Sequence, residues 1–183
     1  MNSSIAPRDP PHPDLRLSAR RRPPLYSAPE RLRRDASAWT LVQGILAPIQ
    51  FAVFLVSLLL VLRFLATGEG LQAATLSVVV KTFTLYTIMI TGCLWEKDVF
   101  GVYLFAPAFY WEDVFSMMVL ALHTAYLAAL ATHWLTAQQL MVLALAAYAA
   151  YVINATQFLL KLRAARLDQA LRNPDLVAKG QPA

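Results

Sequence analysis

Residues 41–62 read LVQGILAPIQFAVFLVSLLLVL, an apolar run without a single charge, and this stretch decides the fold. Three further apolar blocks follow it: LQAATLSVVVKTFTLYTIMITGCL (71–94), VFSMMVLALHTAYLAALATHWL (114–135) and QQLMVLALAAYAAYVINATQFLL (138–160). Each block approaches or exceeds the roughly 20 residues that a helix needs to cross the hydrocarbon core of a bilayer. Because a backbone in lipid has to satisfy its own hydrogen bonds, we expect all four blocks to be helical. The sequence therefore predicts an all-α integral membrane protein, a bundle of four transmembrane helices.

The composition agrees with a membrane protein and excludes several other classes. Hydrophobic residues make up 58% of the 183 residues and charged residues 15%, whereas soluble domains carry about 25% charged residues. The single cysteine, Cys93, excludes an internal disulfide and a thiolate metal cluster. The sequence contains no Gly-rich phosphate loop, dinucleotide fingerprint or HExxH motif. It therefore predicts no cofactor.

The basic residues predict the orientation in the membrane. Of the sixteen Lys and Arg residues, thirteen lie before residue 39 or after residue 160. Because cytoplasmic segments are enriched in Lys and Arg, we expect both termini and the 95–113 loop to be cytoplasmic. The expected location is a multi-pass protein of the cytoplasmic (inner or intracytoplasmic) membrane. The net charge of +5 then faces anionic lipid rather than nucleic acid.

Three regions make up the predicted domain organisation. Residues 1–38 hold Pro clusters and many Arg with few apolar residues, a composition typical of a disordered tail. Residues 39–167 form the predicted four-helix membrane domain, and 168–183 a flexible C-terminal tail. Asp35 and Ser37 are candidate N-caps for the first membrane helix.

Several polar side chains are predicted to meet near the middle of the membrane. Counted from the helix ends at about 1.5 Å per residue, Gln50, Lys81 and His123 fall at similar depth, with Tyr148 and Tyr151 in the same layer. Ionisable groups at that depth are costly and normally mark a functional site. Two structural alternatives remain open: Lys81 snorkels to the interface, or His123 hydrogen-bonds a neighbouring helix.

The segment WEKDVFGVYLFAPAFYWED (95–113) combines four carboxylates with many aromatic residues. It is too apolar for a solvated linker, and too short and too broken by Pro107 for another span, so we expect an interfacial loop with its rings at headgroup depth. Carboxyl groups pressed against rings and lipid retain protons near neutral pH. Glu96, Glu112 and Asp113 therefore suit acid–base chemistry. The alternative is that the acids only cap helices, as Asp113 is placed to do.

Three stretches carry a resemblance to a known family: RRDASAWTLVQGILAPIQFAVFLVSLLLVLRFLATGEG, VVVKTFTLYTIMITGCLWEKDVFGVYLFAPAFYWEDVFSMMVLALHTAYLAAL and AAYAAYVINATQFLLKLRAAR. From about Leu25 to about Leu167 the chain resembles the 3-vinyl bacteriochlorophyllide hydratase family. The most specific part is the aromatic and acidic block from WEKDVFG to FYWEDVFSM, together with the ALHTAYLAAL that follows it.

The resemblance implies a hydro-lyase of bacteriochlorophyll a synthesis. Such an enzyme adds water across the 3-vinyl group of a Mg-chlorin, chlorophyllide or a bacteriochlorophyllide, to give a 1-hydroxyethyl group. The substrate brings its own Mg, and no other cofactor is implied. One alternative is a pigment-binding or pigment-transfer membrane protein without catalysis. Another is a small transporter that uses Lys81 as a coupling charge, although no internal repeat supports it.

For this reaction we expect Glu112 and Glu96 to act as acid and base, with Asp113 as the third candidate. The expected substrate-binding residues are Lys81, Trp95, Tyr110, Trp111, Asn154, Arg163 and Arg166, the two arginines holding the pigment's propionate. His123 is the candidate ligand of the substrate's Mg through neutral imidazole; a water is the alternative, because Mg prefers oxygen ligands. The expected partners are the Mg-chlorin and the lipid bilayer. Assembly with a second copy or with other enzymes of the same synthesis stays open.

Overall fold

The computed structural model describes the backbone of residues 25–172 and the side chains as far as Leu167. Five helices make up this part of the chain: α2 (Ala28–Ala36), α3 (Ala38–Thr67), α4 (Leu71–Phe100), α5 (Tyr110–Thr132) and α6 (Ala137–Arg172). No strand occurs between residues 25 and 172. The last four helices are long and apolar enough to cross a membrane. The prediction of a four-helix membrane bundle is therefore confirmed.

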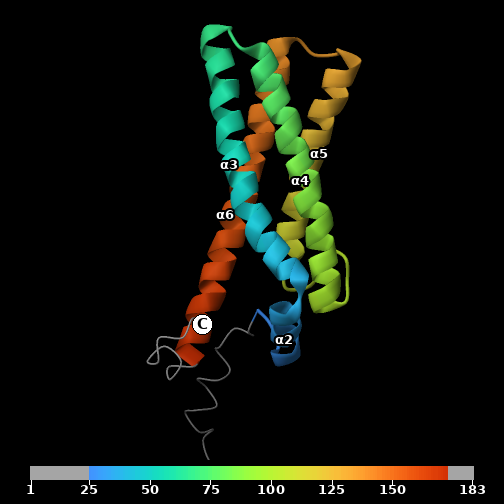
Figure 1. The fold of residues 1–183 in the computed structure, drawn as a ribbon, viewed down its shortest axis with the longest axis vertical. Coiled ribbons are helices and arrows are strands. Elements are labelled where there is room, and N and C mark those ends of the chain that lie inside the picture. The colour runs from blue at the N-terminus through green and yellow to red at the C-terminus, as the bar shows by residue number, and fades with distance from the viewer. Residues whose placement is uncertain (1–24, 173–183) are drawn as a thin grey trace, which may run out of the picture.

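The four long helices form two antiparallel hairpins, α3 with α4 and α5 with α6 (Figure 1). The first hairpin turns tightly because Gly68 ends α3 in the left-handed conformation, with φ 75°, which glycine adopts without a steric penalty. The second turns at His133, with φ 53°. The end of the bundle that carries these two turns is called the turn end below, and the opposite end, where α2 lies, is called the α2 end.

The interior of the bundle is built from aromatic and small apolar residues contributed by all four long helices. Its main cluster contains Phe54, Val78, Tyr126, Met141 and Tyr148. The outward faces expose large apolar side chains, such as Leu59 of α3 and Leu159 of α6. An apolar exterior of this kind suits lipid, which offers no polar partner to a side chain.

The helix ends differ from the sequence prediction on both sides of the interfacial segment. α4 continues to Phe100 and α5 begins at Tyr110, so the connecting loop covers only 101–109 rather than 95–113. At the C-terminal side, α6 runs to Arg172, which corrects the prediction of a flexible tail over 168–172. Residues 173–183 lie outside the described part.

Helix α2 corrects the prediction that residues 1–38 form a disordered tail. Ser27 and Glu30 stabilise its first turn, because the backbone N–H and the hydroxyl of Ser27 both donate to Glu30 Oε2 at 2.7 Å. A proline stands in that first turn, where it is tolerated. The Arg- and Pro-rich composition of residues 1–38 gave no sign of a helix, whereas the motif SAPE at residues 27–30 is a typical helix start. Residues 1–24 lie outside the described part, so the prediction there stays a prediction.

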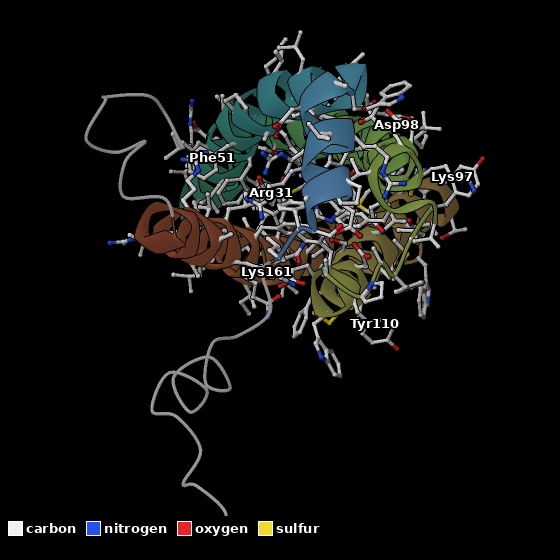
Figure 2. The ribbon with its side chains drawn as sticks, turned by 90° about the horizontal axis from the view of Figure 1, so that it is seen from below. Arg31, Phe51, Lys97, Asp98, Tyr110 and Lys161 are labelled. Carbon is white, nitrogen blue, oxygen red and sulfur yellow. The ribbon has the colours of Figure 1, made fainter. Side chains whose placement is uncertain are left out.

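Contacts with α4 hold α2 across the end of the bundle (Figure 2). Ser37, which links α2 to α3, donates its hydroxyl to Asp98 at 2.5 Å. Trp95 donates its indole N–H to Thr40 at 3.0 Å. Tyr26, just before α2, is buried against the rings of Phe100 and Phe109. Ser37 is the N-cap residue of α3, as predicted.

Candidate functional site

The three predicted catalytic carboxyl groups all lie at the α2 end of the bundle. Glu96 is in the last turns of α4, whereas Glu112 and Asp113 are in the first turn of α5. All three are buried, with 4–8% of their surface exposed. Acidic side chains are seldom buried unless they are paired. Their partners therefore decide what each can do.

Glu96 and Asp113 form a pair that closes the 101–109 loop. Their carboxyl groups lie within hydrogen-bonding reach of each other. Each also accepts a backbone N–H from the loop, Glu96 from Ala106 at 3.2 Å and Asp113 from Phe105 at 2.8 Å. The second bond holds Phe105 at φ 61°, a conformation that a bulky residue seldom adopts. The N-cap of α5 is Phe109, so Asp113 orders this loop instead of capping the helix.

The electrostatics of this pair favour one shared proton. Two buried carboxylates in direct contact repel each other, and burial penalises each charge further. A hydrogen bond between two carboxyl groups requires that one be protonated. Acids in such contact titrate as a pair rather than singly, which makes this pair a candidate proton donor.

Glu112 has the opposite environment, because a cation faces it. Lys161 of α6 donates to Glu112 Oε2 at 2.5 Å and lies over the Phe109 ring, 4.9 Å from its centroid. A charge-assisted bond of this kind is stronger than one between neutral groups. The layer thus contains a pair of contacting carboxyl groups and, next to Asp113 in the sequence, a carboxyl group paired with a cation.

Aromatic rings line one side of the carboxyl layer. Trp95, Phe100, Phe109 and Phe158 pack together, with neighbouring ring centroids 5.7–5.9 Å apart. Trp95, a predicted substrate-binding residue, belongs to this wall. Such a wall is an apolar surface against which a flat ring system stacks.

Other predicted substrate-binding residues lie apart from the carboxyl layer. Tyr110 and Trp111 are exposed on the outside of α5 with their rings against each other, and Tyr110 lies at the rim in Figure 2. Arg163 and Arg166 are exposed on α6 beyond Lys161. The positions of these four suit the membrane interface, where aromatic and basic side chains gather. Their binding roles stay predictions.

Asn154 is buried between α5 and α6, next to the carboxyl layer. Its amide group donates to the hydroxyl of Ser116 at 2.8 Å. Ser116 lies one turn after Glu112 on the same face of α5. Asn154 and Lys161 are seven residues apart and so share one face of α6. Their partners across the helix interface were not predicted, and neither was the position of Tyr26.

Of the residues predicted to meet in mid-membrane, four lie together on α4, α5 and α6: Lys81, His123, Tyr148 and Tyr151. Gln50, the fifth, is buried on α3. Lys81 is fully buried, and its Nζ lies 3.8 Å from the centroid of the Tyr151 ring. The His123 ring is 5.9 Å from that of Tyr148, and its Nδ1 bonds the Val119 carbonyl at 2.8 Å. A carbonyl only accepts, so Nδ1 carries the proton and Nε2 keeps its lone pair. Lys81 does not snorkel: its ammonium group stays inside.

His123 is too far along α5 to serve the carboxyl layer directly. It is eleven residues beyond Glu112, which corresponds to about 16 Å along the axis of a helix. The predicted Mg-ligand role is untested by the structure and stays a prediction.

The chain is similar over most of its length to one characterised family. The profile of the 2-vinyl bacteriochlorophyllide hydratase family matches residues 26–164. The 2-vinyl bacteriochlorophyllide hydratase of Cereibacter sphaeroides is 69% identical over 144 residues, which cover 79% of this chain and 89% of the relative. That of Rhodobacter capsulatus is 67% identical over 146 residues, covering 80% and 85%. No solved structure matches the chain.

The matched region begins at Tyr26 and ends after Lys161. It therefore contains the aromatic wall, the carboxyl pair, the Glu112–Lys161 ion pair and the mid-membrane layer. The resemblance seen in the sequence is confirmed, with the vinyl position numbered 2 rather than 3 in the family's name. This chain belongs to the 2-vinyl bacteriochlorophyllide hydratase family.

Proposed function

We propose that this membrane protein is a hydratase that adds water across a vinyl substituent of a bacteriochlorophyllide or chlorophyllide in bacteriochlorophyll synthesis. The observation that carries this proposal is the match to curated hydratases at 69% and 67% identity over most of both chains. The geometry supports it, because hydration needs a proton donor and a proton acceptor and the carboxyl layer offers one of each. The reaction transfers no electrons, so the proposal includes no redox cofactor.

The chemistry consists of one proton addition and one water addition. A proton adds to the terminal vinyl carbon, and the electron pair of the double bond forms the new C–H bond. The adjoining carbon becomes cationic, and the macrocycle delocalises that charge. The oxygen of water then bonds to this carbon while a base takes one of its protons. The product is a 1-hydroxyethyl group, and the acid and the base are restored by one net proton transfer between them.

The local environments of the carboxyl groups suggest which one donates the proton and which one accepts it. The Glu96–Asp113 pair holds a proton against the repulsion of a second carboxylate, so it is suited to donate. Glu112 is kept ionised by Lys161 at 2.5 Å, so it is suited to accept the proton from water. Lys161 acts through Glu112 and is a positioning residue. Two carboxyl environments that differ in this way are the usual basis for separate acid and base roles.

The aromatic wall suggests how the pigment is held. Trp95, Phe100 and Phe158 of this wall are half-buried around the buried Phe109, and a flat macrocycle gains contact area by stacking on such rings. Exposed Arg163 and Arg166 lie beyond Lys161 toward the C-terminus of α6, where a propionate at the membrane surface would meet them. The Mg remains part of the substrate.

The decisive experiment uses the purified full chain in detergent, a vinyl chlorophyllide and water enriched in ¹⁸O. We expect a product heavier by one water that carries one ¹⁸O atom on the former vinyl group, formed without any added cofactor. A control incubation contains a pigment whose vinyl group has been reduced to ethyl, which offers no double bond. Tight binding of the vinyl pigment without any ¹⁸O product contradicts the hydratase proposal and leaves the pigment-binding alternative.

A further inference from the structure

Five buried side-chain atoms in the described part of the chain have no hydrogen-bond partner. They are Lys81 Nζ, His123 Nε2, Tyr126 OH, Asn154 Oδ1 and Gln157 Oε1. Buried polar groups are nearly always satisfied, so each exception needs a physical reason. The acid–base mechanism proposed above uses none of these five atoms.

The five atoms belong to a column of polar residues between α4, α5 and α6 that has two parts. Along α6, polar side chains recur every three or four residues at positions 148, 151, 154, 157 and 161. The mid-membrane part holds Lys81 over the Tyr151 ring and His123 against Tyr148. The other part lies toward the Glu112–Lys161 pair, where Asn154 bonds Ser116. A buried apolar cluster of Leu85, Val119 and Ala150 lies between the two parts.

The energetic cost of the mid-membrane end of the column is high. Each unsatisfied buried polar group lowers the stability of the fold, and an amino group such as that of Lys81, without a counter-charge, lowers it further. No carboxylate contacts Lys81 among residues 25–167. An apolar side chain at position 81 would avoid this cost, so the polar groups indicate a bound polar molecule.

Water matches the donors and acceptors that the column presents. Lys81 donates, and His123 Nε2 accepts because its Nδ1 already donates to Val119. Tyr126 does either, whereas the bare oxygens of Asn154 and Gln157 accept. A buried water needs two to four polar partners, and the mid-membrane group offers three. A neutral molecule that both donates and accepts satisfies all five atoms, which an anion does not.

We propose that the bundle binds water in two places, at Lys81, His123 and Tyr126 in mid-membrane and at Asn154 and Gln157 toward Glu112, and that the second site supplies the water consumed at Glu112. The first part concerns binding alone. The second part rests on the proposed hydratase function. A flat pigment stacked on the aromatic wall covers the carboxyl layer from the surface, so the attacking water has to be present inside the bundle beforehand.

The binding part is tested by hydroxyl-radical labelling of the full chain in lipid nanodiscs, with brief X-ray radiolysis in ¹⁸O-enriched water. Radicals form wherever water is bound, so we expect ¹⁸O incorporation at His123 and Tyr126, although neither side chain is exposed. In Lys81→Leu this labelling should fall to background. Thr156→Val is the matched control, because Thr156 is exposed on α6 and bonds only its own helix. Background labelling of His123 and Tyr126 in the unaltered protein overturns the proposal.

The supply part is tested by turnover. We expect Asn154→Leu to lower kcat about tenfold or more with little change in pigment affinity, because only the catalysed step loses its water. Thermal unfolding in detergent confirms that the variant is folded, and Thr156→Val should keep full turnover. Normal kcat in Asn154→Leu overturns the supply. Failure of the hydratase proposal looks different, since the unaltered protein would then give no ¹⁸O product while its labelling persists.

Discussion

Glu112 and Glu96 are both buried carboxyl groups in one layer of the bundle, yet their neighbours carry different charges. Lys161 faces Glu112 at 2.5 Å, whereas Glu96 faces the carboxyl group of Asp113. The difference comes from α6 and α5, not from the sequence around either glutamate. The chemistry of the site therefore depends on the neighbours of individual residues, and single substitutions test it.

Glu112→Gln tests the proposed base. Glutamine keeps the size and one acceptor oxygen but accepts no proton, so we expect kcat to fall about 10²-fold or more. Pigment affinity, measured by absorbance titration, should change little. Glu69→Gln is the control, because Glu69 is exposed at the turn end. Normal turnover of Glu112→Gln would remove Glu112 from the mechanism.

His123→Phe tests whether His123 Nε2 binds water or the Mg of the pigment. Phenylalanine keeps the ring volume, so if Nε2 binds water the affinities for a Mg-chlorin and for its metal-free form should change equally. If His123 ligates Mg, only the Mg-chlorin should lose affinity, and absorbance titration of both pigments on one variant shows which holds. A selective loss for the Mg-chlorin assigns Nε2 to the metal and removes His123 from the proposed water site.

Sequence spacing predicted which side chains share a helix face but not which helix they meet. The stripe of Glu112, Ser116 and His123 follows from their four- and seven-residue separations, and all three are buried. The partners of these residues depend on how each helix is rotated about its axis and how far it slides past its neighbour. Neither the rotation nor the sliding of a helix can be predicted from one sequence, because lipid is as apolar as most of the helix interface. The hydrophobic pattern therefore distinguishes poorly between the face toward lipid and the face toward a neighbouring helix.

At the scale of elements, the length of each apolar block was enough to predict a membrane span, whereas the residues at which each helix begins and ends became clear only from the structure. α4 extends beyond Leu94 because Glu96 and Asp98 are satisfied by the 101–109 loop and by Ser37, so these polar residues do not end the helix. α2 escaped prediction because its Arg-rich composition masked the capping pair of Ser27 and Glu30. Its position depends on one buried aromatic residue. Burial raises the pKa of Tyr26 to about 12, with Arg34 opposing the shift, so the phenol stays neutral at physiological pH.

Tyr26→Ala tests whether this one anchor docks α2 on the bundle. Removing a buried aromatic ring costs about 3–5 kcal/mol in a protein core, which exceeds what a nine-residue helix retains without packing. We expect α2 amides to exchange hydrogen much faster, while amides in α3 to α6 stay protected. Leu32→Ala is the matched control, since Leu32 is 73% exposed on the same helix. Unchanged α2 exchange in Tyr26→Ala would mean that the Ser37–Asp98 bond suffices to hold the helix.

At the scale of the whole molecule, the four spans bring α2 and the C-terminal part of α6 to the same end of the bundle (Figure 1). The carboxyl layer, the aromatic wall and the exposed arginines Arg163 and Arg166 lie at that end as well. The turn end has little charge: Arg63 and Glu69 face each other there at 3.9 Å. This asymmetry links the site to one side of the membrane, and the distribution of basic residues predicts which side.

Reporter fusions test that orientation. Thirteen of the sixteen Lys and Arg residues lie before residue 39 or after residue 160, and the positive-inside rule places such segments in the cytoplasm. We expect a fluorescent reporter that matures only in the cytoplasm to be active after Ala183, and alkaline phosphatase, which needs the periplasm, to be inactive there. The same pair inserted between Gly68 and Gly70, at the turn end, should give the reverse. Phosphatase activity after Ala183 would place the carboxyl layer on the periplasmic side, and the pigment would then have to reach the enzyme from that face.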